Sequence, residues 1–293
     1  MLTLDGCEEL TGKALASDTR SDFQAAVSPL LNEYKILSFG IGRSSTHWRA
    51  RIIENDRFGL LNEIDYPPAN VIARPGRLND VGEPYFYASS NIETAVAEVL
   101  PKEGQLVQIA GFRIVPNGVL RLICLGEYQS VYKRGYTSFN GTDPGGTVRK
   151  LIHKMSFEER QMCLLIDNFL AHVISNREAR NNNYLHSRSL RDLLYDHVGA
   201  DGITFPSARD LGGVNFGVKP YPSDKLYHNV CCIIVRVGRK MQFAPLEMEL
   251  VDAASGLTPD RKGFVWEAER KPTQFVMYNM TKDEYEARHS MDS

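Results

Sequence analysis

The apolar positions of this chain recur in several segments at the three- and four-residue spacing of an amphipathic helix. That spacing predicts a helix over residues 20–34, a longer one over 156–173 and a third over 189–194. Ser156, followed three residues later by Glu159, forms the pattern of a capping box, in which the two side chains accept backbone N–H groups at the start of a helix. The long helix is therefore expected to begin at Ser156.

Other segments alternate between apolar and polar residues or are continuously apolar, as β-strands are. Strands are expected at residues 48–53, 85–88, 106–115, 119–125, 230–237, 241–251 and 274–280. Ser90 with Glu93 forms a second capping-box pattern, so a helix is expected to begin at Ser90. Helices and strands are mixed without a regular βαβ repeat, which predicts an α+β fold with a mixed β-sheet core and flanking helices.

Composition limits the classes of function. The chain has 293 residues, of which 43% are hydrophobic and 24% charged, so it can bury a substantial core. Its 34 Lys and Arg against 36 Asp and Glu leave a net charge of −2, which provides no overall positive field for nucleic acid. The chain opens without a signal-peptide pattern and has no run of about 18 apolar residues, so we expect a cytoplasmic protein that does not cross a membrane.

Neither a metal site nor a disulfide is expected. The 7 histidines are dispersed, and the 5 cysteines form an odd set without CxxC spacing, which is typical of reduced, buried thiols. A local basic cluster between Arg177 and Arg188 is more typical of a solvated face than of a nucleic-acid site.

Four short segments carry the candidate chemistry. They are Arg49-Ala50-Arg51; Gly76-Arg77-Leu78-Asn79 with Gly82; Tyr85-Phe86-Tyr87-Ala88 leading to Glu98; and residues 201–209 with Ser207, followed by Asn215. In this order and spacing they resemble the RES-domain family. Members of that family are typically toxins of bacterial toxin–antitoxin pairs that destroy NAD, with a fold similar to that of ADP-ribosyltransferase toxins.

The resemblance covers about residues 46–240 and implies a domain organisation. A catalytic domain is expected over residues 46–245, with a helical insertion at about 150–197. An N-terminal helical extension of residues 1–45 would precede it, and a C-terminal β-rich extension of residues 246–293 would follow.

The resemblance also implies a role for individual residues. The implied catalytic residues are Arg49, Arg77, Tyr87, Glu98 and Ser207, and the implied substrate-binding residues are Arg51, Gly76, Asn79 and Asn215. Sequence alone does not decide whether Arg49 or Arg51 is the first arginine of the family pattern.

The residue types suit NAD chemistry. A guanidinium makes bidentate, charge-assisted hydrogen bonds to the phosphate oxygens that NAD presents. Glycines such as Gly76 and Gly82 allow a loop backbone to approach a ligand closely. Cleavage of the nicotinamide–ribose bond develops positive charge on the ribose, which a carboxylate such as Glu98 can stabilise. Tyr87 could stack on the nicotinamide or ribose, and Ser207 could hydrogen-bond ribose hydroxyls.

We therefore expect an NAD phosphorylase or glycohydrolase that takes NAD as substrate, uses phosphate or water as nucleophile and needs no cofactor. The resemblance implies a helix-turn-helix antitoxin partner, and a homo-oligomer is left open. Two alternatives remain: ADP-ribosyl transfer onto a macromolecule, and a non-catalytic NAD-binding sensing module. The second is kept because Leu78 stands where the family usually has an aromatic residue, and about 110 residues separate Glu98 from Ser207, more than in compact members.

Overall fold

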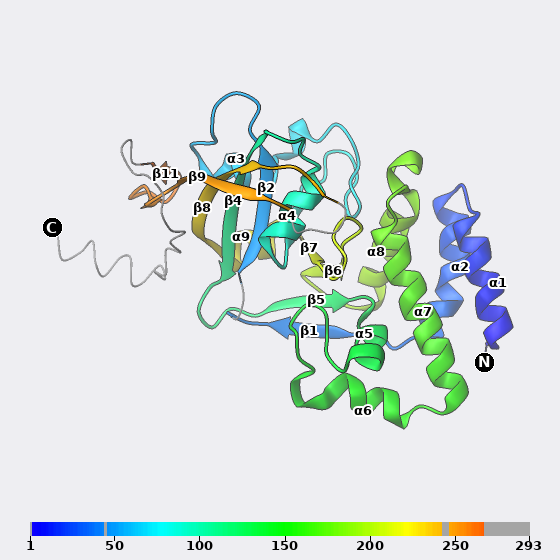
Figure 1. Cartoon of the computed structure of the whole chain (residues 1–293). Helices are drawn as coiled ribbons and strands as arrows, with labels where there is room; N and C mark the ends of the chain where they lie inside the picture. The colour runs from blue at the N-terminus through cyan, green and yellow to red at the C-terminus, as the bar shows by residue number, and fades with distance from the viewer. Residues whose placement is uncertain (1, 44–45, 242–245, 267–293) are drawn as a thin grey trace. The chain divides into compact units, whose positions relative to one another are not determined.

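The chain forms two compact units in a computed structural model that describes residues 2–43, 46–241 and 246–266 (Figure 1). Of the described residues, unit 1 comprises those within 2–40, 68–85 and 121–219, and unit 2 comprises those within 41–67, 86–120 and 220–266. Both units contain helices and β-strands, so the predicted α+β class is confirmed. The domain boundaries expected at residues 45 and 245 remain a prediction.

Unit 1 is mainly helical. Its α-helices are α1 (Leu4–Leu15), α2 (Arg20–Glu33), α5 (Glu127–Arg134), α6 (Thr147–Lys154), α7 (Phe157–Ser175) and α8 (Leu185–His197), with short 3-10 helices η1 (Ala69–Val71), η2 (Pro144–Gly146) and η3 (Ala179–Asn182). Its strands are β1 (Ser38–Ile41), β5 (Leu120–Cys124), β6 (Gly202–Pro206) and β7 (Val214–Val218), in the spatial order β1-β5-β6-β7. β5 and β6 are parallel and β6 and β7 antiparallel, so this part of the sheet is mixed.

Helix α7 is the central helix of unit 1, because it packs against α1, α5, α8 and β6. It begins as the sequence predicts: the Ser156 hydroxyl accepts the Glu159 N–H, and the Glu159 carboxylate accepts the Ser156 N–H. Residues 150–197, expected as an insertion, therefore contribute to the core of this unit. Side chains such as Ile166 and Leu170 of α7 are fully buried there.

Unit 2 is mainly β-structure. Its strands are β2 (His47–Ile52), β3 (Phe86–Ser89), β4 (Leu106–Ile114), β8 (Tyr227–Val237), β9 (Met248–Ala253) and the small pair β10 (Gly256–Leu257) and β11 (Phe264–Val265). Its helices are α3 (Leu61–Ile64), α4 (Ile92–Val99) and α9 (Pro220–Leu226). The strands follow the order β3-β2-β4-β8-β9, and the neighbouring pairs are antiparallel.

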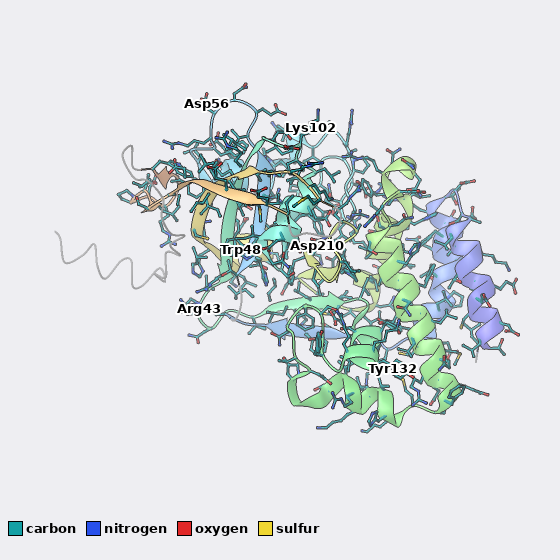
Figure 2. All side chains as sticks on the ribbon, in the orientation of Figure 1. Arg43, Trp48, Asp56, Lys102, Tyr132 and Asp210 are labelled. Atoms are coloured by element: carbon teal, nitrogen blue, oxygen red, sulfur yellow. The ribbon has the colours of Figure 1, made fainter. Side chains whose placement is uncertain are left out.

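The strands of unit 2 have two chemically different faces. Trp48 and Ala50 of β2 lie on an apolar face with Ile109 of β4 and Ile233 of β8, and α4 packs on this face through Ala95 and Val96. Figure 2 labels Trp48 among the side chains of unit 2. Because successive side chains of a strand point to opposite faces, His47, Arg49 and Arg51 lie on the other face, called here the arginine face.

Most predicted elements are present, but one helix start differs and several elements, among them α5, α6, β6 and β7, were not predicted. Helix α4 begins after Asn91 and not at Ser90: the Asn91 side chain accepts the Thr94 N–H at 2.7 Å, and asparagine caps helices as well as serine does. Helix α1, which was not predicted, precedes α2. Of the strand expected over 241–251, residues 248–251 belong to β9 and residues 242–245 lie outside the described residues, as does the strand expected over 274–280.

The cysteines agree with the prediction, because all five are free and buried. No helix within residues 2–43, 46–241 and 246–266 is both long enough and apolar enough to cross a bilayer.

Candidate functional site

The arginines of β2 hold the chain that follows α3. The Arg49 guanidinium donates from Nε to the Ile64 carbonyl at 2.8 Å and from Nη1 to the Tyr87 carbonyl at 2.6 Å. Arg51 donates from Nη2 to the Asp65 carbonyl at 2.8 Å. Both predicted arginines therefore hold backbone carbonyls on the arginine face, Arg49 those of residues 64 and 87 and Arg51 that of residue 65.

Burial shifts the pKa values of Arg49 and of the neighbouring Asp65. It lowers the pKa of Arg49 to about 10, and the neighbouring positive charge of Arg51 lowers it further. Burial also raises the pKa of the Asp65 carboxyl, against the opposing effects of the Tyr66 backbone N–H and the two arginines. Arg49 remains charged at neutral pH, and its Nη2 has no hydrogen-bond partner among the described residues. That nitrogen is a donor available to an anionic ligand.

Tyr87 and Glu98 are placed by β3 and α4. Phe86, which precedes Tyr87, packs on the arginine face with Phe112 and lies 5.8 Å from the Arg49 guanidinium. Strand alternation then puts the half-buried Tyr87 on the opposite, apolar face, where Ser89 pairs with Trp48. Glu98 belongs to α4, which covers the same face, as Figure 1 shows for α4 and β2. Tyr87 and the helix of Glu98 thus lie toward one face, but the Tyr87 side chain still acts electrostatically on Arg49 across the strand and raises the pKa of its guanidinium.

The other predicted residues belong to unit 1, where Arg77 is engaged by α7. Its Nη1 donates to the carbonyls of Ile174 at 2.8 Å and Asn176 at 2.7 Å, at the C-terminal end of α7. The negative end of a helix favours a cation in this position. The guanidinium also lies 5.6 Å from the ring of Tyr184. Arg77 is consequently held in place by the helices that the sequence suggested were an insertion.

The loop around Arg77 is closed by its own backbone. The Gly76 N–H donates to the Asn79 carbonyl, and the Gly82 N–H donates to the Ile72 carbonyl, both at 3.0 Å. Gly82 has a φ of 73°, a left-handed conformation that explains a glycine there, whereas Gly76 is not among the glycines with positive φ. Asn79 is 6% exposed and donates to the Asp80 carbonyl at 3.1 Å. Asn79 therefore contributes at least in part to the shape of this loop.

A charge network that the sequence analysis missed positions this loop. Asp80 accepts hydrogen bonds from Arg20 at 2.5 Å and from Arg188, and Arg191 donates to the Leu78 carbonyl at 2.8 Å. Partial burial raises the pKa of the Asp80 carboxyl, but the bonds from Arg20 and Arg188 outweigh it and the pKa is lowered. Arg188 is therefore not part of a solvated face, which corrects the expectation for that basic cluster. Its three-residue spacing from Arg191 on α8 was the available signal.

Ser207 and Asn215 lie on the β6–β7 hairpin. The Ser207 hydroxyl accepts the N–H groups of Arg209 at 3.0 Å and Asp210 at 3.1 Å, which shapes the turn between the strands. Asn215 is 6% exposed and pairs with Phe205 across the hairpin. Ser207 follows the end of β6, where its N–H donates to the Gly213 carbonyl, so it lies two residues along the hairpin from the Phe205–Asn215 pair.

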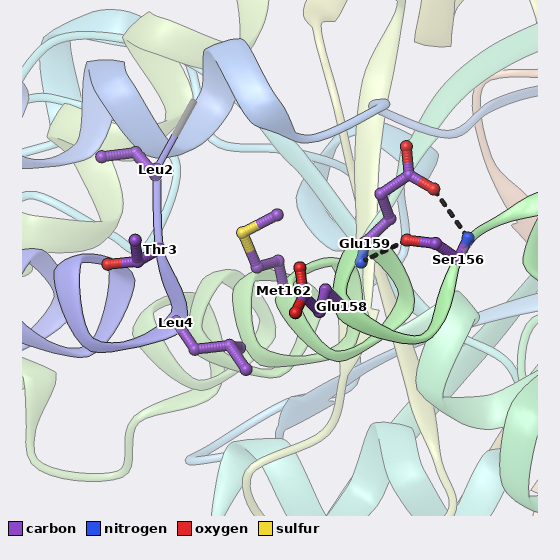
Figure 3. Close-up of a pocket in the computed structure, with 7 residues that line it drawn as sticks. All are labelled: Leu2, Thr3, Leu4, Ser156, Glu158, Glu159 and Met162. Atoms are coloured by element: carbon purple, nitrogen blue, oxygen red, sulfur yellow. Dashed lines mark hydrogen bonds between the residues drawn. The ribbon is translucent and has the colours of Figure 1, made fainter.

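Two cavities lined by described residues of unit 1 differ in character. The first, of about 470 Å³, lies where Leu2, Thr3 and Leu4 face the start of α7, and Figure 3 shows its lining. Its polar lining consists of Thr3, the Ser156–Glu159 cap and Glu158, so the described lining residues carry negative charge and include no cation for a phosphate.

The second cavity, of about 760 Å³, is lined by Arg74, Arg180 and Arg188, by Gly76 and Tyr184 beside Arg77, and by Ala73, Pro75, Val81 and Asn183. No carboxylate is among the described residues that line it. The described residues also contain no group of three or more His, Cys, Asp or Glu side chains that could hold a metal ion.

One family model, that of the RES domain, matches residues 46–231, a range that contains every predicted site residue. Among solved structures, the chain is similar to the crystal structure of the M. tuberculosis MbcT–MbcA toxin–antitoxin complex. The identity is 10%, the alignment covers 90% of this chain and 96% of that chain, and the TM-score is 0.33. No curated protein matches the chain.

Proposed function

The chain belongs to the RES domain family, and from this premise we propose that it is an enzyme that cleaves the bond between nicotinamide and ribose in NAD. The family match over residues 46–231 is the observation that carries the proposal. The proposal is also supported by the position of Tyr87 and the helix of Glu98 on one face of the strands, because the proposed reaction uses a stacking ring and a carboxylate near the ribose.

In the proposed reaction, the bond from ribose C1′ to the nicotinamide nitrogen breaks and its electron pair leaves with nicotinamide, which departs as a neutral ring. An oxygen of water or of inorganic phosphate forms the new bond to C1′, and water loses its proton in that step. The Glu98 carboxylate stabilises the positive charge that develops on the ribose. Tyr87 stacks on the nicotinamide or ribose, and Ser207 contacts a ribose hydroxyl.

Arg77 is assigned to a phosphate oxygen of NAD. Its side chain is already held by the carbonyls of Ile174 and Asn176, so little side-chain freedom would be lost on binding. Of the two arginines of β2, we prefer Arg49 to Arg51 as the first arginine of the family pattern, because its guanidinium makes two backbone contacts and keeps Nη2 available.

The departure at Leu78 does not favour the non-catalytic alternative. The Leu78 side chain is 0% exposed, so a leucine in place of an aromatic residue changes core packing and removes no contact with a ligand. As typical members of the family do, the protein would act as the toxin of a pair whose second member is a small antitoxin, which the resemblance suggests has a helix-turn-helix.

The test is NAD consumption by the purified chain, with and without inorganic phosphate, with nicotinamide and the ADP-ribose products separated by chromatography. Glu98→Gln should lower kcat about 10²-fold or more. Glu93→Gln, on the exposed side of the same helix, is the matched control and should retain wild-type kcat. Dependence on phosphate would identify a phosphorylase.

Other outcomes point elsewhere. NAD binding without nicotinamide release would leave a sensing module, and ADP-ribose attached to protein or nucleic acid, detected by mass spectrometry, would indicate a transferase. Growth arrest on expression in a bacterium, relieved by Glu98→Gln, would support the toxin role.

A further inference from the structure

The arginine-lined cavity of unit 1 has the chemistry of an anion site. Arg74 and Arg180 are exposed, line the same cavity of about 760 Å³, and make no side-chain hydrogen bond or ion pair with any described residue. Arg188, by contrast, is paired with Asp80 and with the Asn183 carbonyl. The cavity therefore retains two guanidinium groups whose charge nothing in the described structure neutralises.

The backbone beside this cavity is strained. Asn183 and Tyr184 both have positive φ, at 54° and 59°. Asparagine adopts this left-handed conformation readily, but for a bulky residue such as Tyr184 it is uncommon and strained. The result is that Tyr184 lies against Arg77 and also lines the cavity. Strain kept next to charged groups is typical of a ligand site.

The cavity also has a suitable size and neighbourhood. Small-molecule sites commonly enclose about 300–1,000 Å³. Gly76 and Pro75 form part of the wall, so the cavity adjoins the segment that carries Arg77. A guanidinium binds phosphate through two parallel N–H···O bonds, and a site with several arginines and no carboxylate selects an anion over a neutral ligand.

We propose that this cavity binds the phosphate groups of a nucleotide, with Arg74 and Arg180 as the binding residues. Arg188 shapes the wall through its pair with Asp80, and Tyr184 links the cavity to Arg77. That the nucleotide is NAD rests on the proposed function, whereas the anion site itself does not. Arg74 and Arg180 lie within the family match over residues 46–231 but are not among the motif residues to which the resemblance assigns a role.

The experiment is isothermal titration calorimetry of the full chain with ADP, adenosine, ADP-ribose and inorganic phosphate. ADP should bind more tightly than adenosine. The double variant Arg74→Gln/Arg180→Gln should weaken ADP binding about tenfold or more, since a hydrogen bond to a charged group contributes roughly 1.5–3 kcal/mol. Adenosine binding should not change. Arg121→Gln, an exposed arginine of unit 1 outside the cavity, is the matched control and should bind ADP as the wild type does.

A second variant, Arg74→Lys/Arg180→Lys, keeps the charge but loses the bidentate geometry, and should recover only part of the affinity. Loss of phosphate binding in the glutamine variant would identify inorganic phosphate as the ligand, and loss confined to ADP and ADP-ribose would identify the diphosphate. Equal affinities for ADP and adenosine, or an unchanged affinity for ADP in the glutamine variant, would overturn the proposal. If NAD is never consumed but ADP binding still depends on these arginines, the proposed function fails and the anion site remains.

Discussion

Two buried carboxylates at the start of α5 should make the stability of unit 1 depend on pH. Asp167 of α7 is 0% exposed and accepts hydrogen bonds from the Tyr34 hydroxyl at 2.7 Å and from the N–H groups of Gly126 at 3.0 Å and Gln129 at 2.9 Å. Burial nevertheless raises its pKa to about 6, and burial raises the pKa of Glu127 to about 7, with the charge of Asp167 adding to that rise. The ionised forms are therefore disfavoured in the folded chain.

The size and sign of the effect follow from the pKa of Asp167. Because the folded-state pKa of about 6 lies above the ordinary value of 3.8, the group contributes stability that is fully present below pH 3.8 and is lost as pH rises through about 6. The difference corresponds to about 3 kcal/mol, of which about 2 kcal/mol falls between pH 4 and pH 8. Asp167→Asn replaces the carboxyl with a neutral amide of the same shape, so this loss should be absent in the variant.

The assay is urea denaturation of wild type and Asp167→Asn at several pH values from 4 to 8, followed by circular dichroism. The free energy of unfolding of the variant minus that of the wild type should rise by about 2 kcal/mol over this range, and somewhat more because Glu127 then titrates without its charged neighbour. Asn168→Ala, at the neighbouring exposed position on α7, changes no titratable group and should give a difference that does not change with pH. A constant difference for Asp167→Asn as well would refute the assigned cost of burying its charge.

Two further substitutions test local features of unit 2. Asn91→Ala should lower stability in thermal unfolding by about 1 kcal/mol, because it removes the side chain that caps α4. Asn91→Ser should retain most of the wild-type stability. Equal melting temperatures for wild type and the alanine variant would contradict the cap. Gly111→Ala should destabilise the chain by about 1–3 kcal/mol, because a Cβ there would lie 2.5 Å from the Cys231 Sγ. The control is Gly12→Ala on α1, where an added Cβ meets nothing within 4 Å. This substitution should stabilise the folded chain by about 0.5–1 kcal/mol. A similar change in stability at both positions would show that the crowding at Gly111 is relieved without cost.

Local signals in the sequence were sufficient for much of the fold. The apolar runs of β4 and β8 and the Ser156–Glu159 cap of α7 depend on neighbours a few residues apart, and each is found where it was expected. The start of α4 was misplaced because Ser90 and Asn91 are both good capping residues. Only the backbone conformation decides which of them accepts the Thr94 N–H.

The sequence by itself determined the α+β class, most of the strands and the family, because periodicity, caps and the order of motif residues are properties of neighbouring positions. The tertiary structure alone decided which faces these residues occupy. Strand pairing placed Arg49 opposite the face that α4 covers, and the end of α7, nearly 100 residues away in the chain, supplied the carbonyls for Arg77. The arginine-lined cavity likewise joins residues 73–81 to residues 180–188. Such contacts depend on how distant segments pack, and no local pattern encodes them.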